Sequence, residues 1–154
     1  MKTSVRSALL GAALLLAGCA YEHHESTSMA KASLYDRLGG SYAIAAVVDD
    51  FMARLLADPV VTGNAVAVSK LPPEHVPGLT FQLTALMCEV TGGPKAYTGR
   101  SMKDVHTGMK ITEAEWNAMA ADFQATLDHF KVPAAEQKEL FDIVGSTKAD
   151  IVGV

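Results

Sequence analysis

The apolar residues of this chain recur at intervals of three and four positions, which is the period of an α-helix. Ile44, Val47, Val48, Phe51 and Leu55 show the pattern clearly, since they fall on one helical face. No segment alternates apolar and polar residues with the period of a strand. The predicted helices span about residues 33–38, 41–57, 77–91, 113–130 and 134–152. We therefore expect an all-α protein.

Capping and breaking residues set the predicted helix boundaries. Ser33 and Ser41 are expected N-caps, because a serine side chain can accept a hydrogen bond from a free amide in the first turn. Thr112, followed three residues later by Glu115, fits a capping box. Residues 59–73 contain turn residues and little periodicity, so they are predicted to form a loop.

One histidine stands in an unusual position between two of the long helices. Gly92, Gly93 and Pro94 end the preceding helix. Ser101 can then cap a short helical turn from Met102 to His106. A lone histidine at such a place is often a surface or core imidazole, so spacing alone leaves its role open.

The stretch from residue 92 to residue 112 resembles the proximal segment of the group 1 truncated haemoglobins. The similarity includes the Gly92–Pro94 break, residues 97–103, His106 and the Ile111–Thr112 pair, and residues 34–40 and 47–51 resemble the start of the family. It extends from about Ser33 to about Val152. It implies an all-α truncated globin, a two-over-two helical sandwich, that holds haem b with His106 as the proximal iron ligand.

The same resemblance implies an apolar haem pocket built from several helices. Composition cannot separate such a pocket from an ordinary core, because both use the same residue types. The residues expected to contact the cofactor are Phe51, Met52, Leu79, Leu83, Leu86, Tyr97, Met102, Met109, Trp116 and Met119.

The distal side of the expected pocket departs from the family pattern. Met52 stands where many members carry a tyrosine, and a thioether cannot donate a hydrogen bond to a gas ligand. The family's distal glutamine aligns near Leu83, which leaves Gln82, one residue away, as a candidate donor. His75 is a candidate for a sixth iron ligand. Because Met52 and Leu83 stand near the positions of the polar residues, we expect an unusually apolar distal side. Residues 62–68 also lack the aromatic pair usual in the family.

The start of the chain has the features of a bacterial lipoprotein signal. Lys2 and Arg6 precede an apolar run, and residues 16–19 resemble a lipobox that ends in Cys19. We expect a signal peptide at residues 1–18, lipidation of Cys19 followed by a flexible tether over residues 19–32, and a globin domain at residues 33–154. This organisation predicts a lipid anchor in the cell envelope, with the outer membrane facing the periplasm favoured.

Three functions remain open from the sequence. The first is reversible binding of a diatomic gas (O2, NO or CO) in the cell envelope. The second is a haem enzyme, either a nitric oxide dioxygenase or a peroxidase-like protein, which would need an electron donor. The third is a haem-less structural lipoprotein on a degenerate globin fold. The formal net charge is −4 and no basic patch is present, so a nucleic-acid partner is not expected.

Overall fold

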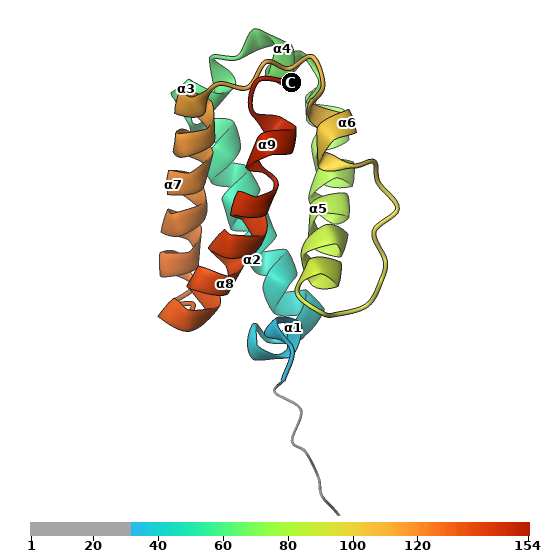
Figure 1. The fold of residues 1–154 in the computed structure, drawn as a ribbon, viewed down its shortest axis with the longest axis vertical. Coiled ribbons are helices and arrows are strands. Elements are labelled where there is room, and N and C mark those ends of the chain that lie inside the picture. Colours follow the sequence, from blue (N-terminus) through green and yellow to red (C-terminus); the bar gives the residue numbers. More distant parts are fainter. Residues whose placement is uncertain (1–31) are drawn as a thin grey trace, which may run out of the picture. The chain divides into compact units, whose positions relative to one another are not determined.

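The computed structural model describes residues 32–154, and that part of the chain is helical (Figure 1). The four long helices are α2 (Gly40–Ala57), α5 (Val76–Val90), α7 (Glu113–His129) and α8 (Ala134–Ser146). The short ones are α1 (Leu34–Arg37), α3 (Pro59–Thr62), α4 (Ala65–Ser69), the 3-10 turn η1 (Pro73–His75), α6 (Met102–His106) and α9 (Lys148–Ile151). Helix α2 packs against both α5 and α7, and α8 packs against α1. The predicted all-α, two-over-two architecture is confirmed.

Several predicted helix starts are confirmed at the level of individual hydrogen bonds. The Ser33 hydroxyl accepts from the Asp36 amide at 3.1 Å, and the Ser101 hydroxyl accepts from the Asp104 amide at 3.1 Å. Thr112 and Glu115 form the complete capping box at the start of α7. In each case a polar side chain satisfies a backbone amide that the helix itself leaves free.

Two predicted boundaries are wrong. Ser41 is not an N-cap, because α2 already begins at Gly40, with Gly39 at its cap position in a left-handed conformation (φ 93°). Residues 59–73 are not a loop either, since they contain α3, α4 and the first residue of η1. Asp58 caps α3 and Asn64 caps α4, and these local hydrogen bonds support helices too short to show a hydrophobic period.

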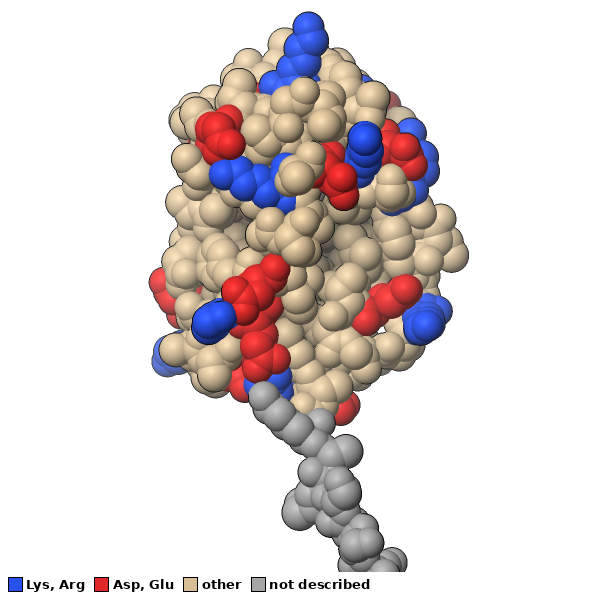
Figure 2. All heavy atoms as spheres, viewed as in Figure 1, with Lys and Arg blue, Asp and Glu red and all other residues tan. Residues whose placement is uncertain are grey.

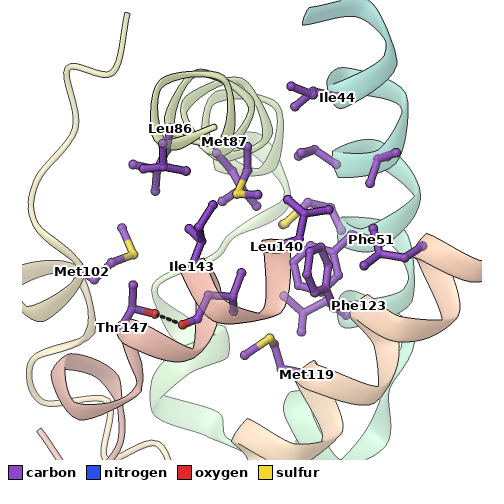
Figure 3. Close-up of a pocket in the computed structure, with 18 of the residues that line it drawn as sticks. Ile44, Phe51, Leu86, Met87, Met102, Met119, Phe123, Leu140, Ile143 and Thr147 are labelled. Carbon is purple, nitrogen blue, oxygen red and sulfur yellow. Dashed lines mark hydrogen bonds between the residues drawn. The ribbon is translucent and has the colours of Figure 1, made fainter. Parts of the chain in front are cut away.

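The last predicted helix is also divided. It was expected over residues 134–152, but α8 ends at Ser146 and α9 begins at Lys148. The Thr147 hydroxyl donates to the Val144 carbonyl at 2.7 Å (Figure 3), so a side chain closes the end of α8. Directly after α9, Val152 is extended and forms an isolated parallel bridge with Ile111.

The buried core consists of two clusters of side chains. One part contains Leu34, Phe123, Leu127 and Leu140, and the other contains Ile44, Val48, Met52 and Cys88. The Phe123 ring stands edge-on to Phe51 at a centroid distance of 5.5 Å. None of the described helices is long and apolar enough to cross a bilayer. The predicted lipobox and Cys19 lie outside the described residues.

Candidate functional site

An internal cavity of about 600 Å³ lies among the long helices (Figure 3). Its wall is largely apolar and comes from most of the elements. Among the side chains in Figure 3, Phe51 comes from α2, Leu86 from α5, Met119 from α7 and Ile143 from α8. A cavity of this size falls in the range of about 300–1,000 Å³ that small-molecule and cofactor pockets occupy.

His106 is the one histidine that the described part of the chain brings to this cavity. It is the last residue of α6, and its ring Nδ1 lies 2.7 Å from the carbonyl oxygen of Met102. A carbonyl only accepts hydrogen bonds, so Nδ1 must carry the ring proton. The other nitrogen, Nε2, then keeps its lone pair, and this tautomer of the neutral imidazole is able to bind a metal.

The structure places all ten predicted cofactor-contacting residues along the cavity. That these residues line one cavity is observed in the structure, whereas their contact with a cofactor stays a prediction. They are Phe51, Met52, Leu79, Leu83, Leu86, Tyr97, Met102, Met109, Trp116 and Met119.

The sequence analysis missed two parts of the cavity wall. The first comes from the end of the chain: Leu140, Ile143, Val144, Thr147 and Ile151. The second comes from the α3–α4 region: Val61, Ala67 and Leu71. Helical periodicity marks the apolar face of residues 134–152, but it does not say whether that face meets another side chain or a cavity. The α3–α4 region gave no periodic signal at all.

The three distal candidates have different positions. Met52 lines the cavity, is only 3% exposed, and packs with Ile44, Val48 and Cys88. Gln82 also lines the cavity. His75 ends η1 and immediately precedes α5, and it is not among the residues that line the cavity.

The side-chain amide of Gln82 is only half satisfied. Its Nε2 lies 3.2 Å from the Thr98 hydroxyl oxygen, which ties α5 to the loop before α6. Its Oε1 is buried and has no hydrogen-bond partner. A buried carbonyl oxygen without a partner is unfavourable. In the opposite orientation of the amide, Thr98 would donate to Oε1 and Nε2 would be free to donate elsewhere.

Charged groups are few along the cavity. Arg37, Glu115 and Lys131 are the charged residues of its wall. The Thr112 amide donates to Glu115 Oε2 at 2.6 Å, and the Thr112 hydroxyl donates to the same oxygen. These bonds lower the pKa of Glu115, because they stabilise its charged form. Figure 2 shows charged side chains around a largely uncharged centre on the face viewed.

Comparison with known proteins gives consistent results. The family model of the bacterial-like globins matches residues 33–152. The group 1 truncated hemoglobin GlbN of Mycolicibacterium paratuberculosis is 33% identical over 122 residues, which cover 78% of this chain and 84% of that protein. The group 1 truncated hemoglobin of Tetrahymena pyriformis is 29% identical over 121 residues, which cover 79% of this chain and 95% of that protein.

Solved structures show the same relationship. The Fe(III) form of Tetrahymena pyriformis truncated hemoglobin superposes with a TM-score of 0.71 at 28% identity, covering 80% of this chain and all of the other. A 2/2 hemoglobin from Synechococcus in the cyanomet state, with covalently attached heme, gives a TM-score of 0.69 at 26% identity over 80% of this chain and all of the other.

The fold and the cavity define a small helical protein built around an apolar chamber with one histidine in its wall. Because the family model matches residues 33–152, the chain belongs to the bacterial-like globin family. The two relatives named above are group 1 truncated hemoglobins.

Proposed function

We propose that this globin holds haem b in its internal cavity and binds a diatomic gas there reversibly, with His106 as the proximal iron ligand. One observation supports the role of His106 most directly: its Nδ1 is engaged by Met102, which leaves Nε2 available in a side chain of the cavity wall. The haem would supply an iron centre that binds O2, NO or CO reversibly, without a net chemical reaction.

The residues of the cavity fit this cofactor. A porphyrin needs an apolar slot for its ring system and a neutral imidazole for its iron. The apolar wall provides the slot, and the hydrogen bond from His106 Nδ1 to Met102 fixes both the tautomer and the orientation of the imidazole. Tyr97 reaches the same cavity, and its hydroxyl donates to the Arg100 carbonyl, which braces the loop before α6.

The distal residues favour weak rather than strong retention of oxygen. Met52 fills a buried position in the wall with a side chain that donates no hydrogen bond. Gln82 is the remaining amide in the wall, and the unpaired state of its Oε1 supports an orientation with the N–H group toward the cavity. On this proposal, Gln82 alone supplies a polar contact to the gas.

We further propose that the protein is anchored in the cell envelope through a lipid on Cys19. The lipobox-like residues 16–19 and the preceding positively charged and apolar segments support this location. Cys19→Ser should abolish incorporation of labelled fatty acid. Failure of the wild type to incorporate the label would refute the lipid anchor, and it would leave the haem proposal untouched.

Absorption spectroscopy tests the haem proposal. The protein from residue 26 onward would be reconstituted with hemin, and ferric, ferrous and carbon monoxide spectra recorded for the wild type and for His106→Ala. His129→Ala is the matched control, since His129 is exposed at the end of α7 and does not line the cavity.

The wild type should take up one haem per chain and show a Soret band that shifts with carbon monoxide. His106→Ala should weaken or alter that spectrum, whereas His129→Ala should leave it unchanged. Failure of the wild type to take up haem would refute gas binding and would favour the structural lipoprotein. A normal spectrum in His106→Ala would refute the role of this histidine.

A further inference from the structure

The five residues after His106 form a loop whose hydrogen bonds run mainly to distant segments of the chain. We call residues 107–111 the proximal loop. Gly108 has φ 80° and Lys110 has φ 54°, so the backbone turns through the left-handed region twice. That conformation is ordinary for glycine but uncommon for lysine, and it persists only where the surroundings fix it. Met109 N donates to the His106 carbonyl at 2.9 Å, so the loop bends back on the histidine itself.

Residues from two distant segments satisfy the other backbone groups of the proximal loop. From the α4 region, Lys70 Nζ donates to the Thr107 carbonyl at 2.9 Å, and Asn64 Nδ2 donates to the Met109 carbonyl at 3.1 Å. From the last residues, Gly153 N donates to the Ile111 carbonyl at 2.9 Å, and the Val154 oxygen accepts from the amides of residues 108 and 110. The loop is therefore held from both sides.

Of the two side chains that support the loop, Asn64 makes more hydrogen bonds than Lys70. Its Oδ1 caps α4 by accepting from the amides of Val66 and Ala67 at 3.1 and 3.0 Å, while its Nδ2 donates to Met109. Both ends of the amide are therefore used, and the side chain is half-buried. Lys70, by contrast, is exposed and flexible, so its single bond to the loop is worth less.

The hydrogen bond between Asn64 and Met109 also joins two parts of the cavity wall. Ala67, in the helix that Asn64 caps, lines the cavity, and so does Met109 in the proximal loop. His106 lies between Met109 and the rest of α6. A shift of Asn64 at the start of α4 would therefore also shift the proximal loop, which follows directly after His106 at the end of α6.

We propose that Asn64 is a positioning residue for His106: its hydrogen bond to the Met109 carbonyl fixes the proximal loop and with it the orientation of the imidazole toward the cavity. This inference rests on the proposed role of His106 as iron ligand. Asn64 does not line the cavity, and on this proposal it acts through the backbone of residues 107–111.

Three variants test this role. Asn64→Ser keeps a capping oxygen but has no amide to reach Met109. Asn64→Asp keeps an oxygen that can cap α4 and a side chain of nearly the same shape. It replaces the amide N–H group that faces the Met109 carbonyl with a carboxylate oxygen. Asp58→Ser is the matched control: it makes the same kind of change at the cap of α3, where the Asp58 carboxylate accepts from Val60 N at 2.6 Å.

The measurements are the iron–histidine stretching band of the ferrous, ligand-free protein, the rate of haem loss to excess apomyoglobin, and the melting temperature. Asn64→Ser should shift the band and speed haem loss about fivefold, the factor expected for one lost hydrogen bond. Asn64→Asp should change both in the same direction and by more, because the new carboxylate then faces the Met109 carbonyl and also the Glu115 carboxylate, with which Asn64 interacts. Asp58→Ser should show the wild-type band and haem-loss rate.

The outcomes distinguish failure of the role inferred for Asn64 from failure of the role proposed for His106. If both Asn64 variants keep the wild-type band and haem-loss rate, and lose only as much melting temperature as Asp58→Ser, Asn64 is a helix cap and the inference is wrong. If His106→Ala keeps the wild-type ferrous spectrum and iron–histidine band, the proposed role of His106 fails and the inference fails with it.

Discussion

His106 Nδ1 lies 2.7 Å from the carbonyl oxygen of Met102, four residues earlier in the same short helix. Within an α-helix, a side chain and the backbone one turn before it are neighbours, so the geometry follows from the helix itself. Ser101 caps this helix by accepting a hydrogen bond from the Asp104 amide. The short helix thus directs Nδ1 of the imidazole to its own backbone and leaves the other ring nitrogen free of that contact.

Removing the imidazole of His106 should remove the proposed proximal ligand of the iron but leave the haem pocket intact. We expect His106→Gly to lose the wild-type ferrous and carbon monoxide spectra, and we expect millimolar imidazole to restore them, because the free ring can occupy the vacated space. His75→Gly should match the wild type with or without imidazole, since His75 does not line the cavity. Wild-type spectra for His106→Gly without imidazole would show that another residue holds the iron.

Met52→Tyr tests whether position 52 faces the gas. A tyrosine hydroxyl at the cavity wall can donate a hydrogen bond to a ligand that carries partial negative charge. Hydrogen bonds to charged partners contribute about 1.5–3 kcal/mol, so oxygen release should slow by about ten- to a hundredfold. Stopped-flow displacement of oxygen by carbon monoxide measures this rate.

Met52→Phe is the control for the size of the new side chain. It adds a ring of nearly the same volume without a hydroxyl, so its oxygen release should stay near the wild-type rate. Equal rates for Met52→Tyr and the wild type would mean that residue 52 does not reach the gas, despite its place in the cavity wall.

Gln82 is expected to be the surviving distal donor. Gln82→Leu should speed oxygen release, by about fivefold for one neutral hydrogen bond, in the same displacement experiment. Thr98→Val is the companion variant, because Gln82 and Thr98 lie 3.2 Å apart at their polar atoms. It removes the partner of the amide but not the amide itself, so it should change the rate less than Gln82→Leu. An unchanged rate in Gln82→Leu would exclude this role.

The sequence predicted those parts of the fold that depend on local rules. The capped start of α6 at Ser101 and the capping box at Thr112 are confirmed residue by residue, because each uses hydrogen bonds within one turn. The long helices were found because each presents a regular apolar face. The α3–α4 region was missed because its short helices depend on the Asp58 and Asn64 caps rather than on periodicity.

The site was less predictable than the fold, since it is assembled from distant residues. The resemblance to the group 1 truncated haemoglobins indicated His106. The order of the helices along the chain indicated the parts of the wall that come from α2, α5 and α7. Nothing local indicated that the end of the chain would close the cavity or bond to residues 108–111. That pairing coincides with the end of α9, where Val152 leaves the helical conformation and forms a bridge with Ile111.

Leu127 should be one of the most sensitive positions for stability. Its side chain is 0% exposed and belongs to the core cluster with Leu34, Phe123 and Leu140. Leu127→Ala should lower the free energy of unfolding by about 2–5 kcal/mol, measured by urea denaturation. Val68→Ala, at a position 42% exposed, should change it by less than about 0.5 kcal/mol. A small effect at Leu127 would mean that the cavity beside it collapses to fill the space.

The carboxyl group of Asp122 should destabilise the folded protein near neutral pH. Its Oδ2 is buried without a hydrogen-bond partner. Burial raises the pKa of Asp122, nearby Asp58 raises it further, and Arg54 opposes the shift. Because the folded state favours the protonated form, the cost is absent below the ordinary pKa of 3.8 and appears as the pH rises through the raised value.

Asp122→Asn should therefore be more stable than the wild type at pH 7, with a difference that narrows as the pH falls toward 4. Asp50→Asn is the opposite control. Arg54 and Thr126 donate to Asp50 and lower its pKa, so its charge stabilises the fold above pH 3.8 and this contribution is lost as the pH falls through the lowered value. Asp50→Asn should thus be less stable than the wild type at pH 7. Thermal unfolding of each variant from pH 4 to pH 8 measures both differences. A lower melting temperature for Asp122→Asn at pH 7 would show that the buried carboxylate has a partner in solution and stabilises the fold.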